Sequence, residues 1–248
     1  GEPSEVQLAQ TENLRLLQLT WAGADKYTRM ENLPRSAVLA NASGAFGTII
    51  AEYAIGSLVA LYRSFGRYWS NKQAHIWQKY DHAETISGKT ALVLGMGDIG
   101  ANVARRLKVF GAAVLGVKRT AVSAVPADFD EAHTLDALDA LLPRADIVIG
   151  CLPNTRETAG LLTAERLHAM KAGAVLVNVG RGSLAGTDDL VSALQDGHLG
   201  GAALDVFETE PLPADCPLWD MENVLLTPHI AGPSFGGSAD VQNTIWHI

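Results

Sequence analysis

The sequence of 248 residues contains few cysteines, and their placement excludes several classes of protein. Cys151 and Cys216 form no CxxC pair and no regular ladder of spacings, so we expect neither a disulfide framework nor a cysteine-based metal site. A reducing compartment suits such a chain, and we therefore expect a cytoplasmic protein. His, Cys, Asp and Glu nowhere group with the spacing of metal ligands, so no metal is expected.

Long apolar runs and clusters of positive charge are also lacking. The longest apolar stretch, residues 47–62, is interrupted by Glu52 and Tyr53, which makes it too short and too polar for a membrane span. Lysine and arginine number 19 against 27 aspartates and glutamates, and the formal net charge is -8. Nucleic-acid surfaces and polybasic membrane patches need clustered cations. We therefore expect a small-molecule partner rather than a nucleic acid or a membrane.

Apolar residues are plentiful and regularly arranged. They make up 48% of the chain, enough to bury the core of one large domain or two small ones. Short apolar segments alternate with longer segments of helical apolar spacing, and Gly and Pro separate them. This alternation is typical of an α/β fold with a doubly wound parallel sheet of the Rossmann type. We expect strands at residues 16–20, 37–40, 90–94, 113–117, 147–151, 174–179, 201–205 and 224–227, and helices at 47–67, 99–110, 135–142, 164–170 and 188–196.

A glycine-rich turn, GMGDIG at residues 95–100, follows the expected strand at 90–94 and precedes an expected helix. In a dinucleotide site the first glycine of GxGxxG permits the tight turn, the second lets pyrophosphate approach the backbone, and the third lets the helix pack on the strand. The free amides of the helix N-terminus attract the anion. A GxGxxG alone is weak evidence and can be a turn without a ligand, but its context here favours a dinucleotide. The residues expected to contact the cofactor are Gly95, Gly97, Asp98, Ile99 and Gly100.

The residues after the next expected strand indicate which nicotinamide cofactor is bound. An acidic side chain about 20 residues beyond the glycines would accept a hydrogen bond from the ribose 2′-OH of NAD. Lys118, Arg119 and Thr120 stand there instead. Two cations and a hydroxyl suit a 2′-phosphate, because arginine meets phosphate with a planar set of donors. We therefore predict NADP over NAD; the alternative is that both cations only face solvent.

Three further segments each place a reactive side chain just after an expected strand. They are NVGRG at residues 178–182, DVFETEP at 205–211 and TPHIAG at 227–232. Together with the glycine-rich turn, this ordered set closely resembles the D-isomer-specific 2-hydroxyacid dehydrogenases, a family that includes glyoxylate/hydroxypyruvate reductases, D-lactate dehydrogenases and phosphoglycerate dehydrogenases. The resemblance extends from about Leu16 to the last residue. It implies a nicotinamide-dependent oxidoreductase in which a second, smaller, flavodoxin-like domain binds the substrate.

The resemblance also implies the catalytic residues. Transfer of a hydride to a 2-oxo acid develops negative charge on the carbonyl oxygen, so a cation must polarise this oxygen and an acid must protonate it. By resemblance, Arg181 binds the substrate carboxylate and carbonyl, and His229 is the acid in reduction and the base in oxidation. The family pairs its histidine with a carboxylate, matched here by Glu210, which orients the ring and favours its charged form. Glu208 is the less favoured partner, because Glu210 occupies the motif position before Pro211.

The same resemblance assigns residues around the substrate and the cofactor. Ala22 and Gly23 match a loop whose small residues let backbone amides approach the substrate carboxylate, although an ordinary tight turn is the alternative. Trp21 either narrows the pocket or packs this loop. Asp205 is expected near the nicotinamide. Cofactor contacts at strand ends are expected from Cys151, Leu152, Pro153, Thr158, Val179, Gly180, Arg181, Asp205, His229 and Gly232.

A homodimer and a two-domain organisation are further implications of the resemblance. The helix containing Glu52 and the arm beyond it match the family's dimer contact, so Trp77 either reaches a neighbouring subunit's site or packs in the core. The domains implied are residues 1–42, part of the substrate domain; 43–232, the dinucleotide-binding domain with its dimerisation arm; and 233–248, a return to the substrate domain. Family members have a longer N-terminal stretch and a longer last helix, so we expect the substrate domain of this chain to be incomplete.

Two functions from different classes are compatible with these motifs. The first is an oxidoreductase acting on a small 2-oxo acid, with glyoxylate or hydroxypyruvate and NADPH as the best candidates. Phosphorylated substrates are less favoured because Trp21 gives its loop no extra cation, and formate oxidation is disfavoured because it needs no proton relay such as Glu210 and His229. The alternative is a dinucleotide-sensing, corepressor-like protein with little turnover, a class that generally prefers NAD. Lys118 and Arg119 favour the enzyme.

Overall fold

The chain divides into two compact units, each described here by itself. The computed structural model describes residues 3–11, 13–80 and 83–232. The smaller unit contains the residues up to Phe46, and the larger unit spans Gly47–Gly232. The division therefore lies after Phe46, whereas the sequence suggests a boundary after Ala42. The expected return segment, 233–248, lies outside the described residues.

The described residues of the smaller unit form two short parallel strands and two short helices. Its elements in chain order are α1 (Glu5–Ala9), β1 (Leu16–Gln18), α2 (Asp25–Thr28) and β2 (Val38–Ala40). The strands predicted at 16–20 and 37–40 are both present and pair in parallel, but β1 ends earlier than predicted. The buried side chains of this unit form a small cluster of Leu8, Leu17, Leu19 and Tyr27.

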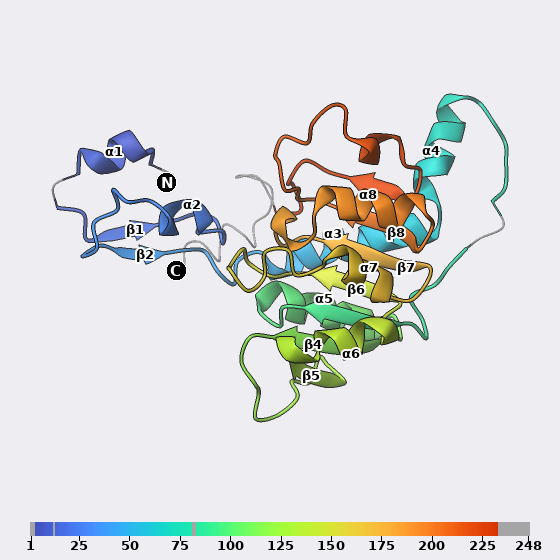
Figure 1. Cartoon of the computed structure of the whole chain (residues 1–248), viewed down its shortest axis with the longest axis horizontal. Helices are drawn as coiled ribbons and strands as arrows, with labels where there is room; N and C mark the ends of the chain where they lie inside the picture. Colours follow the sequence, from blue (N-terminus) through green and yellow to red (C-terminus); the bar gives the residue numbers. More distant parts are fainter. Residues whose placement is uncertain (1–2, 12, 81–82, 233–248) are drawn as a thin grey trace. The chain divides into compact units, whose positions relative to one another are not determined.

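The larger unit is built around a sheet of seven parallel strands in the order β5-β4-β3-β6-β7-β8-β9 (Figure 1). The chain forms β3 first, adds β4 and β5 on one side of it, and then crosses over to add β6 to β9 on the other side. This reversal is the mark of a doubly wound sheet and places a ligand crevice beyond the ends of β3 and β6. The predicted fold class is thereby confirmed. The strands are β3 (Thr90–Leu94), β4 (Ala113–Lys118), β5 (Glu131–Thr134), β6 (Ile147–Gly150), β7 (Ala174–Asn178), β8 (Leu199–Leu204) and β9 (Val224–Leu226).

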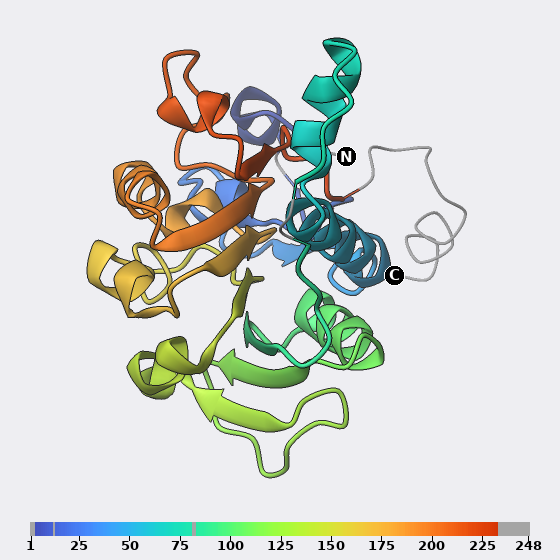
Figure 2. The ribbon, with the colours of Figure 1, turned by 90° about the vertical axis from the view of Figure 1, so that its right-hand side faces the viewer.

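Helices cover both faces of this sheet. Figure 2 shows the sheet between α3 and α5 on one side and α6, α7 and α8 on the other. The helices are α3 (Gly47–Tyr62), α4 (Phe65–Gln73), α5 (Asp98–Val109), α6 (Leu138–Leu141), α7 (Ala164–Ala169) and α8 (Thr187–Gln195). Short 3-10 turns are η1 (Leu135–Ala137), η2 (Leu142–Arg144), η3 (Gly182–Leu184) and η4 (Pro217–Asp220).

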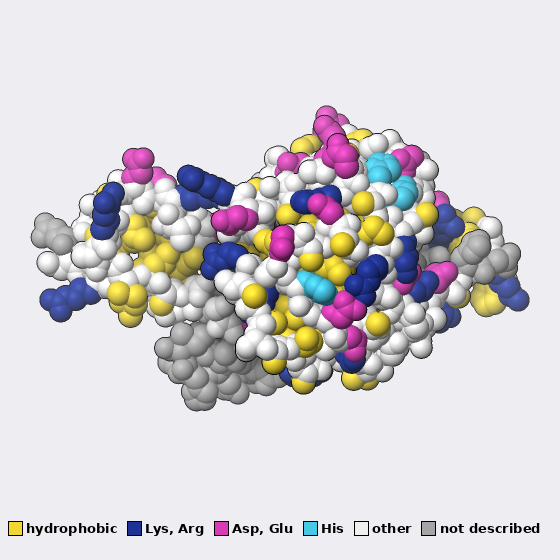
Figure 3. All heavy atoms as spheres, turned by 60° about the horizontal axis from the view of Figure 1, so that its bottom comes forward, with side chains coloured by type: hydrophobic (Ala, Val, Ile, Leu, Met, Phe, Trp, Pro, Cys, Tyr) yellow, Lys and Arg dark blue, Asp and Glu magenta, His cyan; other side chains and the backbone are white. Residues whose placement is uncertain are grey.

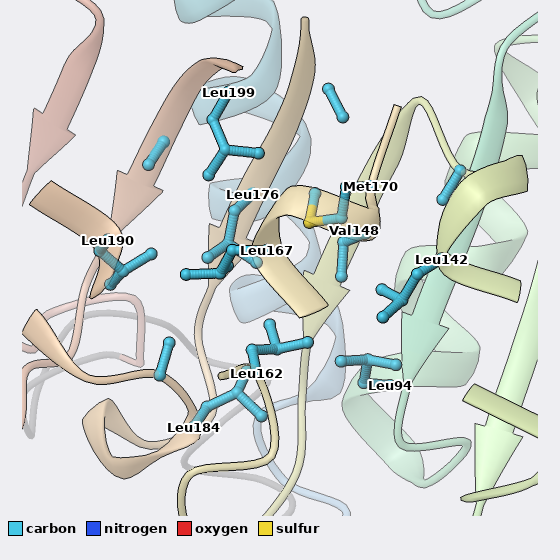
Figure 4. Close-up of a cluster of buried hydrophobic side chains, with 14 of the residues drawn as sticks. Leu94, Leu142, Val148, Leu162, Leu167, Met170, Leu176, Leu184, Leu190 and Leu199 are labelled. Atoms are coloured by element: carbon cyan, nitrogen blue, oxygen red, sulfur yellow. The ribbon is translucent and has the colours of Figure 1, made fainter. Parts of the chain in front are cut away.

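The apolar core follows from the uninterrupted hydrophobic runs of the central strands. All four residues of β6 are buried, as are four of the five residues of β3. Such runs are typical of parallel strands that helices cover on both faces. Side chains of the sheet, such as Leu94 and Val148, meet Leu142 and Leu167 in one cluster (Figure 4). Burial of each such side chain contributes about 2 kcal/mol of transfer free energy.

One predicted helix is wrong in its extent. The sequence predicts a single helix over residues 47–67, but α3 ends at Tyr62 and α4 begins at Phe65. Between them Ser64 adopts a left-handed conformation with φ of 53°, which no α-helix can include. The last buried residue of α3 is Tyr62, and no residue of α4 is buried. Because no residue of α4 is buried, the chain gains no core contact from continuing the first helix along the sheet.

Two further elements differ from the sequence-based prediction. The strand β5 is not predicted, because its sequence EAHT has one apolar residue and therefore no clear alternation. It lies at the edge of the sheet, where a strand needs one hydrogen-bonded neighbour and tolerates polar side chains. The helix predicted at 135–142 is divided into η1, α6 and η2, and Pro143 lies within the last of these turns.

The surface of the described residues mixes charges of both signs. On the face that Figure 3 shows, basic and acidic side chains are interspersed. Among the described residues several opposite charges pair directly, for example Arg105 with Asp128 and Arg144 with Glu131. None of the described helices has the length and apolar character that crossing a bilayer requires.

The carboxyl ends of six strands lie in one row at one edge of the sheet. The paired residues of this row are, in sheet order, Val117, Leu94, Gly150, Asn178, Leu204 and Leu226. The glycine-rich turn follows β3, and the three other motifs follow β7, β8 and β9. Because the strands are parallel and in register, all four motifs lie along this edge.

Candidate active site

The glycine-rich turn has the shape that a pyrophosphate requires. Gly95, directly after β3, has φ of +107°, and a Cβ there would lie 3.0 Å from the carbonyl oxygen of Cys151. A Cβ at Gly100 would lie 1.8 Å from the carbonyl oxygen of Gly95, so the first turn of α5 can rest on the end of β3 only without a side chain. At Gly97 a Cβ would meet nothing within 4 Å. Two tight positions and one open position match the three roles of a dinucleotide-binding turn.

The N-terminus of α5 offers donors to an anion. The helix begins at Asp98, and no side chain in the described part of the chain caps it. Its first amides and the positive end of its dipole therefore face the crevice, and Ile99 lies in the same turn. The Asp98 carboxylate accepts a hydrogen bond from Asn102 Nδ2 at 3.1 Å and lies against Gly47, the first residue of α3. Asp98 can therefore offer a phosphate its amide while its side chain is held elsewhere.

Two cations and a hydroxyl stand at the end of β4. Lys118 is the last residue of the strand and is partly buried, whereas Arg119 and Thr120 are exposed. Neither cation forms an ion pair with any residue that the structure describes. The donors of both side chains are therefore available to an anionic group.

The loop after β6 contributes shape more than free polar groups. Cys151 donates its amide to the carbonyl of Leu94, and burial raises the pKa of its thiol to about 12, so the thiol stays protonated. The hydroxyl of Thr158 donates to the carbonyl of Pro153 at 2.5 Å and accepts from the amide of Thr155 at 2.8 Å. Because this hydroxyl is used within the loop, Thr158 holds the loop's shape.

Arg181 is carried by a turn that the buried side chain of Asn178 ties together. Asn178 Oδ1 accepts from the amide of Gly180 at 3.2 Å, and its Nδ2 donates to the carbonyl of Arg181 at 3.0 Å. Arg181 Nη1 donates to the carbonyl of Gly180 at 2.7 Å. Val179 is buried, and a Cβ at Gly180 would lie 2.7 Å from the carbonyl oxygen of Leu152. The turn therefore rests on the loop after β6.

The same turn packs against the loop that carries Glu210. A Cβ at Gly182 would lie 1.8 Å from the carbonyl carbon of Phe207, so the two backbones are in close contact. Glu210 Oε1 in turn accepts from the amide of Phe207 at 3.0 Å. The backbone of Phe207 therefore links the motif of Arg181 with that of Glu210.

His229 and Glu210 form a direct pair. His229 Nδ1 lies 2.8 Å from Glu210 Oε2, and the side chains are 50% and 37% exposed. Because Nδ1 faces a carboxylate, it carries a proton, and Nε2 is the nitrogen left for a substrate. Nε2 has no partner among residues 3–11, 13–80 and 83–232. The pairing predicted from the motifs is therefore present, with the outer nitrogen accessible.

Asp205 organises the loop of His229. The carboxylate is 2% exposed and accepts three hydrogen bonds, from Thr227 Oγ1 at 2.6 Å, the amide of Ile230 at 2.8 Å and the amide of Ala231 at 2.9 Å. Its carbonyl oxygen accepts from the amide of His229 at 2.8 Å. His229 itself has φ of 57°. The expected place of Asp205 near the nicotinamide stays a prediction, but its side chain is fully used in holding the turn that presents His229 and ends at Gly232.

Glu208 has a different task from Glu210. Its Oε2 accepts a hydrogen bond from the amide of Thr187 at 2.5 Å, at the first residue of α8. An acid at this place satisfies a free amide and complements the helix dipole. Glu208 is therefore engaged by α8, which leaves Glu210 as the partner of His229.

Ala22 and Gly23 belong to the smaller unit. The carbonyl of Ala22 accepts from Asn41 Nδ2 at 2.6 Å, and that of Trp21 accepts from the amide of Ala42 at 3.0 Å. The Trp21 ring stacks on Phe46 with 6.1 Å between centroids. Trp21 thus packs against Phe46. Its part in the pocket and the approach of Ala22 and Gly23 to a substrate carboxylate both stay predictions.

Residues 55–231 match the family model described as "D-isomer specific 2-hydroxyacid dehydrogenase, NAD binding domain". The chain belongs to this family. The resemblance inferred from the four motifs is thereby confirmed, and so is the assignment to the NAD(P)-dependent oxidoreductases. The match to the NAD binding domain also confirms that the cofactor class is a nicotinamide dinucleotide.

Several proteins of this family are similar to the chain over most of its length. A D-isomer specific 2-hydroxyacid dehydrogenase family protein from Aeromonas salmonicida subsp. salmonicida superposes with a TM-score of 0.86 at 40% identity, covering 98% of this chain and 75% of that one. An NADPH-dependent glyoxylate/hydroxypyruvate reductase from Sinorhizobium meliloti, solved with NADP and sulfate, gives a TM-score of 0.86 at 29% identity, covering 100% of this chain and 77% of that one. The D-3-phosphoglycerate dehydrogenase of Mycobacterium leprae is 36% identical over 224 residues, which are 90% of this chain but only 42% of that protein. Family members with different substrates are thus similarly close.

Three side chains that organise the site carry no sequence signal strong enough to predict their roles. Asn178 and Thr227 lie within the quoted motifs, and the only hint is a polar side chain at the end of a buried strand. Tyr53 lies in α3, 174 positions before Thr227, which it contacts. In the described part of the chain, no group of three or more His, Cys, Asp and Glu residues is placed to hold a metal ion.

Proposed function

We propose that the protein reduces a small 2-oxo acid such as glyoxylate or hydroxypyruvate, with NADPH as the preferred hydride donor, in the cytoplasm. The observation that carries this proposal is the pair of His229 and Glu210. His229 Nδ1 lies 2.8 Å from Glu210 Oε2, which leaves His229 Nε2 for the substrate. Arg181 and the glycine-rich turn lie along the same edge of the sheet. An anion-binding cation, a proton donor and a dinucleotide turn are what the reduction of a 2-oxo acid needs.

The glycine-rich turn of the larger unit has the open space and the amide donors that the cofactor needs. The open space at Gly97 and the amides that begin α5 would receive the pyrophosphate. The loop after β6 and the buried Val179 offer an apolar wall to the nicotinamide half. The bound cofactor supplies the hydride, which goes to the carbonyl carbon of the substrate.

Arg181 and His229 divide the work on the substrate. The guanidinium of Arg181 binds the substrate carboxylate and stabilises the negative charge that grows on the carbonyl oxygen. His229 Nε2 donates the proton that this oxygen takes up, and in the reverse direction it accepts that proton. Glu210 fixes the ring through Nδ1 and stabilises the imidazolium before the transfer.

The preference for NADPH rests on Lys118 and Arg119. Both cations stand at the end of β4 without an ion-pair partner among the described residues, and Thr120 adds a hydroxyl. A 2′-phosphate would give these two cations an anionic partner. The ribose of NAD, which has no 2′-phosphate, would not. The similarity to an NADPH-dependent reductase supports this choice.

The proposal is tested by initial rates with glyoxylate and with hydroxypyruvate, each with NADPH and with NADH, for the wild type and for His229→Ala. We expect turnover with NADPH that falls at least about a hundredfold in the variant. Faster oxidation of D-3-phosphoglycerate than of the small 2-hydroxy acids would instead assign the protein to the phosphoglycerate dehydrogenases, to which it is similar.

A binding protein of the same superfamily is the alternative function. Tight binding of the dinucleotide without measurable turnover of any of these acids would favour a sensor or corepressor. Tighter binding of NADH than of NADPH would also favour the sensor or corepressor.

We further propose that the arm formed by α4 and residues 74–80 packs against a second copy of the chain. This arm projects away from the rest of the larger unit (Figures 1 and 2). Trp77 is 98% exposed and Trp69 is 63% exposed, so the alternative that Trp77 packs in the core is wrong. Exposed aromatic side chains gathered on one element are typical of a protein interface. Sedimentation analysis should show a dimer for the wild type and monomers for the variant with Trp69→Ser and Trp77→Ser; a wild-type monomer would overturn this proposal.

A further inference from the structure

A tyrosine of α3, Tyr53, contacts the loop that carries His229. Tyr53 Oη lies 2.5 Å from Thr227 Oγ1, and Thr227 Oγ1 lies 2.6 Å from Asp205 Oδ1. The two oxygens of Asp205 also accept the amides of Ile230 and Ala231, one on each side of the carboxylate. A continuous chain of hydrogen bonds thus runs from α3 to the residues next to His229.

The chemistry of the partners fixes the direction of this chain. Every group around the Asp205 carboxylate is a donor, so the carboxylate acts only as an acceptor, and the single hydroxyl proton of Thr227 points to it. Thr227 Oγ1 can then only accept from Tyr53, which must be the donor of their bond. Burial raises the pKa of the Tyr53 phenol, and the Asp205 charge acts in the same direction, so the proton stays on the tyrosine.

We propose that Tyr53 is a positioning residue for the acid-base histidine, acting through Thr227 and Asp205 on the turn that presents His229. In this role Tyr53 acts through its contact with Thr227 and not on the reacting groups. The inference rests on the proposed function, because it assigns Tyr53 a part in proton transfer by His229. The turn needs such support, since His229 has φ of 57°, a conformation that a residue with a side chain adopts only where its surroundings hold it.

Helix α3 contacts both the glycine-rich turn and the turn of His229. Its first residue, Gly47, lies so close to Asp98 that a Cβ would come within 2.3 Å of the carboxylate oxygen, at the helix end that receives the phosphate. Less than two turns later, Tyr53 reaches Thr227. One rigid helix therefore sets the glycine-rich turn and the His229 turn relative to each other. The distance between hydride donor and proton donor depends on this relation.

The test compares Tyr53→Phe with Tyr62→Phe. Both tyrosines lie in α3 and lose only a hydroxyl, but Tyr62 has no contact with the site motifs among the described residues. Thr227→Val removes the middle hydroxyl, and Thr227→Ser keeps it. The measurements are kcat and KM for glyoxylate and NADPH, and hydrogen exchange of the amides of Ile230 and Ala231, which need no turnover.

For Tyr53→Phe we expect kcat to fall about tenfold, KM for NADPH to change less than about twofold, and both amides to exchange faster. Thr227→Val should behave in the same way, whereas Thr227→Ser and Tyr62→Phe should resemble the wild type. Unchanged exchange and kcat in Tyr53→Phe would overturn the proposal. Equal losses in Tyr62→Phe would also overturn it, because they would assign the effect to the stability of α3.

The two readouts separate this inference from the proposed function. If the protein turns over no 2-oxo acid but the amides of Tyr53→Phe exchange faster, the hydrogen-bond chain is supported and its role in catalysis is not. If the protein reduces glyoxylate but exchange in Tyr53→Phe is normal, the proposed function is supported and the role of Tyr53 is not.

Discussion

The imidazole of His229 and the carboxylate of Glu210 are joined through Nδ1 and Oε2 at 2.8 Å, and the other carboxylate oxygen accepts the amide of Phe207. Because both oxygens are engaged, the carboxylate cannot turn freely, and it fixes the plane of the ring as well as its tautomer. The carbonyl of Phe207 in turn lies against Gly182, next to Arg181. The acid, its partner and the substrate-binding cation are therefore set by contacts with one stretch of backbone.

Glu210→Gln should lower kcat by about a hundredfold with little change in affinity for NADPH. An amide can still accept from one donor, but it cannot stabilise the imidazolium of His229. The measurement is the steady-state rate of glyoxylate reduction, with the dissociation constant of NADPH from fluorescence titration.

Glu208→Gln is the matched control for this prediction. The same change two residues earlier removes a charged acceptor from the amide of Thr187 and should cost no more than about 1 kcal/mol of stability, with kcat retained. If both variants lost kcat equally, Glu210 would have no special part in catalysis.

Lys118→Ala together with Arg119→Ala should raise KM for NADPH at least about tenfold and leave KM for NADH nearly unchanged. The reason is that only NADPH carries the 2′-phosphate that these cations would bind. The check is kcat/KM for both cofactors at several salt concentrations, since the preference should weaken as salt screens the charges. An equal loss for both cofactors would show that the cations act on the fold or on the shared pyrophosphate.

The parts of the molecule that the sequence predicts are those with a local physical signature. The strands β3 and β6 are uninterrupted apolar runs, and GMGDIG stands between a strand and a helix, so their conformation and place follow from neighbouring residues. The pairing of His229 with Glu210 follows from two motifs at the ends of neighbouring strands. Parallel pairing of β8 with β9 then brings them together.

The parts that the sequence does not predict depend on distant partners. The break at Ser64 reflects the end of the surface on which α3 packs, and β5 exists because β4 offers it a hydrogen-bonding edge. The bond between Tyr53 and Thr227 joins residues far apart in the chain. In sequence, Tyr53 is only a polar interruption of an apolar stretch, because no periodicity records where a side chain meets another element.

Asp205→Asn should destabilise the larger unit by about 2 kcal/mol and lower kcat as well. All three partners of this buried carboxylate are donors, and an amide would set its own NH2 group against one of them. Urea unfolding followed by tryptophan fluorescence measures the free energy of unfolding. Asp215→Asn, in an exposed loop, should leave both quantities unchanged; an Asp205→Asn protein of wild-type stability would contradict the hydrogen-bond network described for this turn.

The pair of His168 and Asp196, which lies outside the catalytic motifs, should make the stability of the protein depend on pH. His168 Nε2 lies 2.8 Å from Asp196 Oδ2, and its Nδ1 lies 2.8 Å from the carbonyl oxygen of Ala164. Both nitrogens face acceptors, so the charged ring satisfies both, and the bond to Asp196 raises the pKa of His168. Since the folded pKa lies above the unfolded value, the stabilisation is complete below about pH 6.5 and is lost as the pH rises through the folded pKa.

His168→Gln should therefore lower Tm at pH 6 and have less effect at pH 9, by no more than a few degrees because the pair is exposed. The same bond lowers the pKa of Asp196, so the contribution also fades in strong acid, when that carboxylate takes up its proton. In an Asp196→Asn background the dependence of the effect on pH should disappear. His168 also stacks on His198 with 5.0 Å between ring centroids. A loss of Tm equal at pH 6 and pH 9 would assign the role of His168 to this packing and not to its charge.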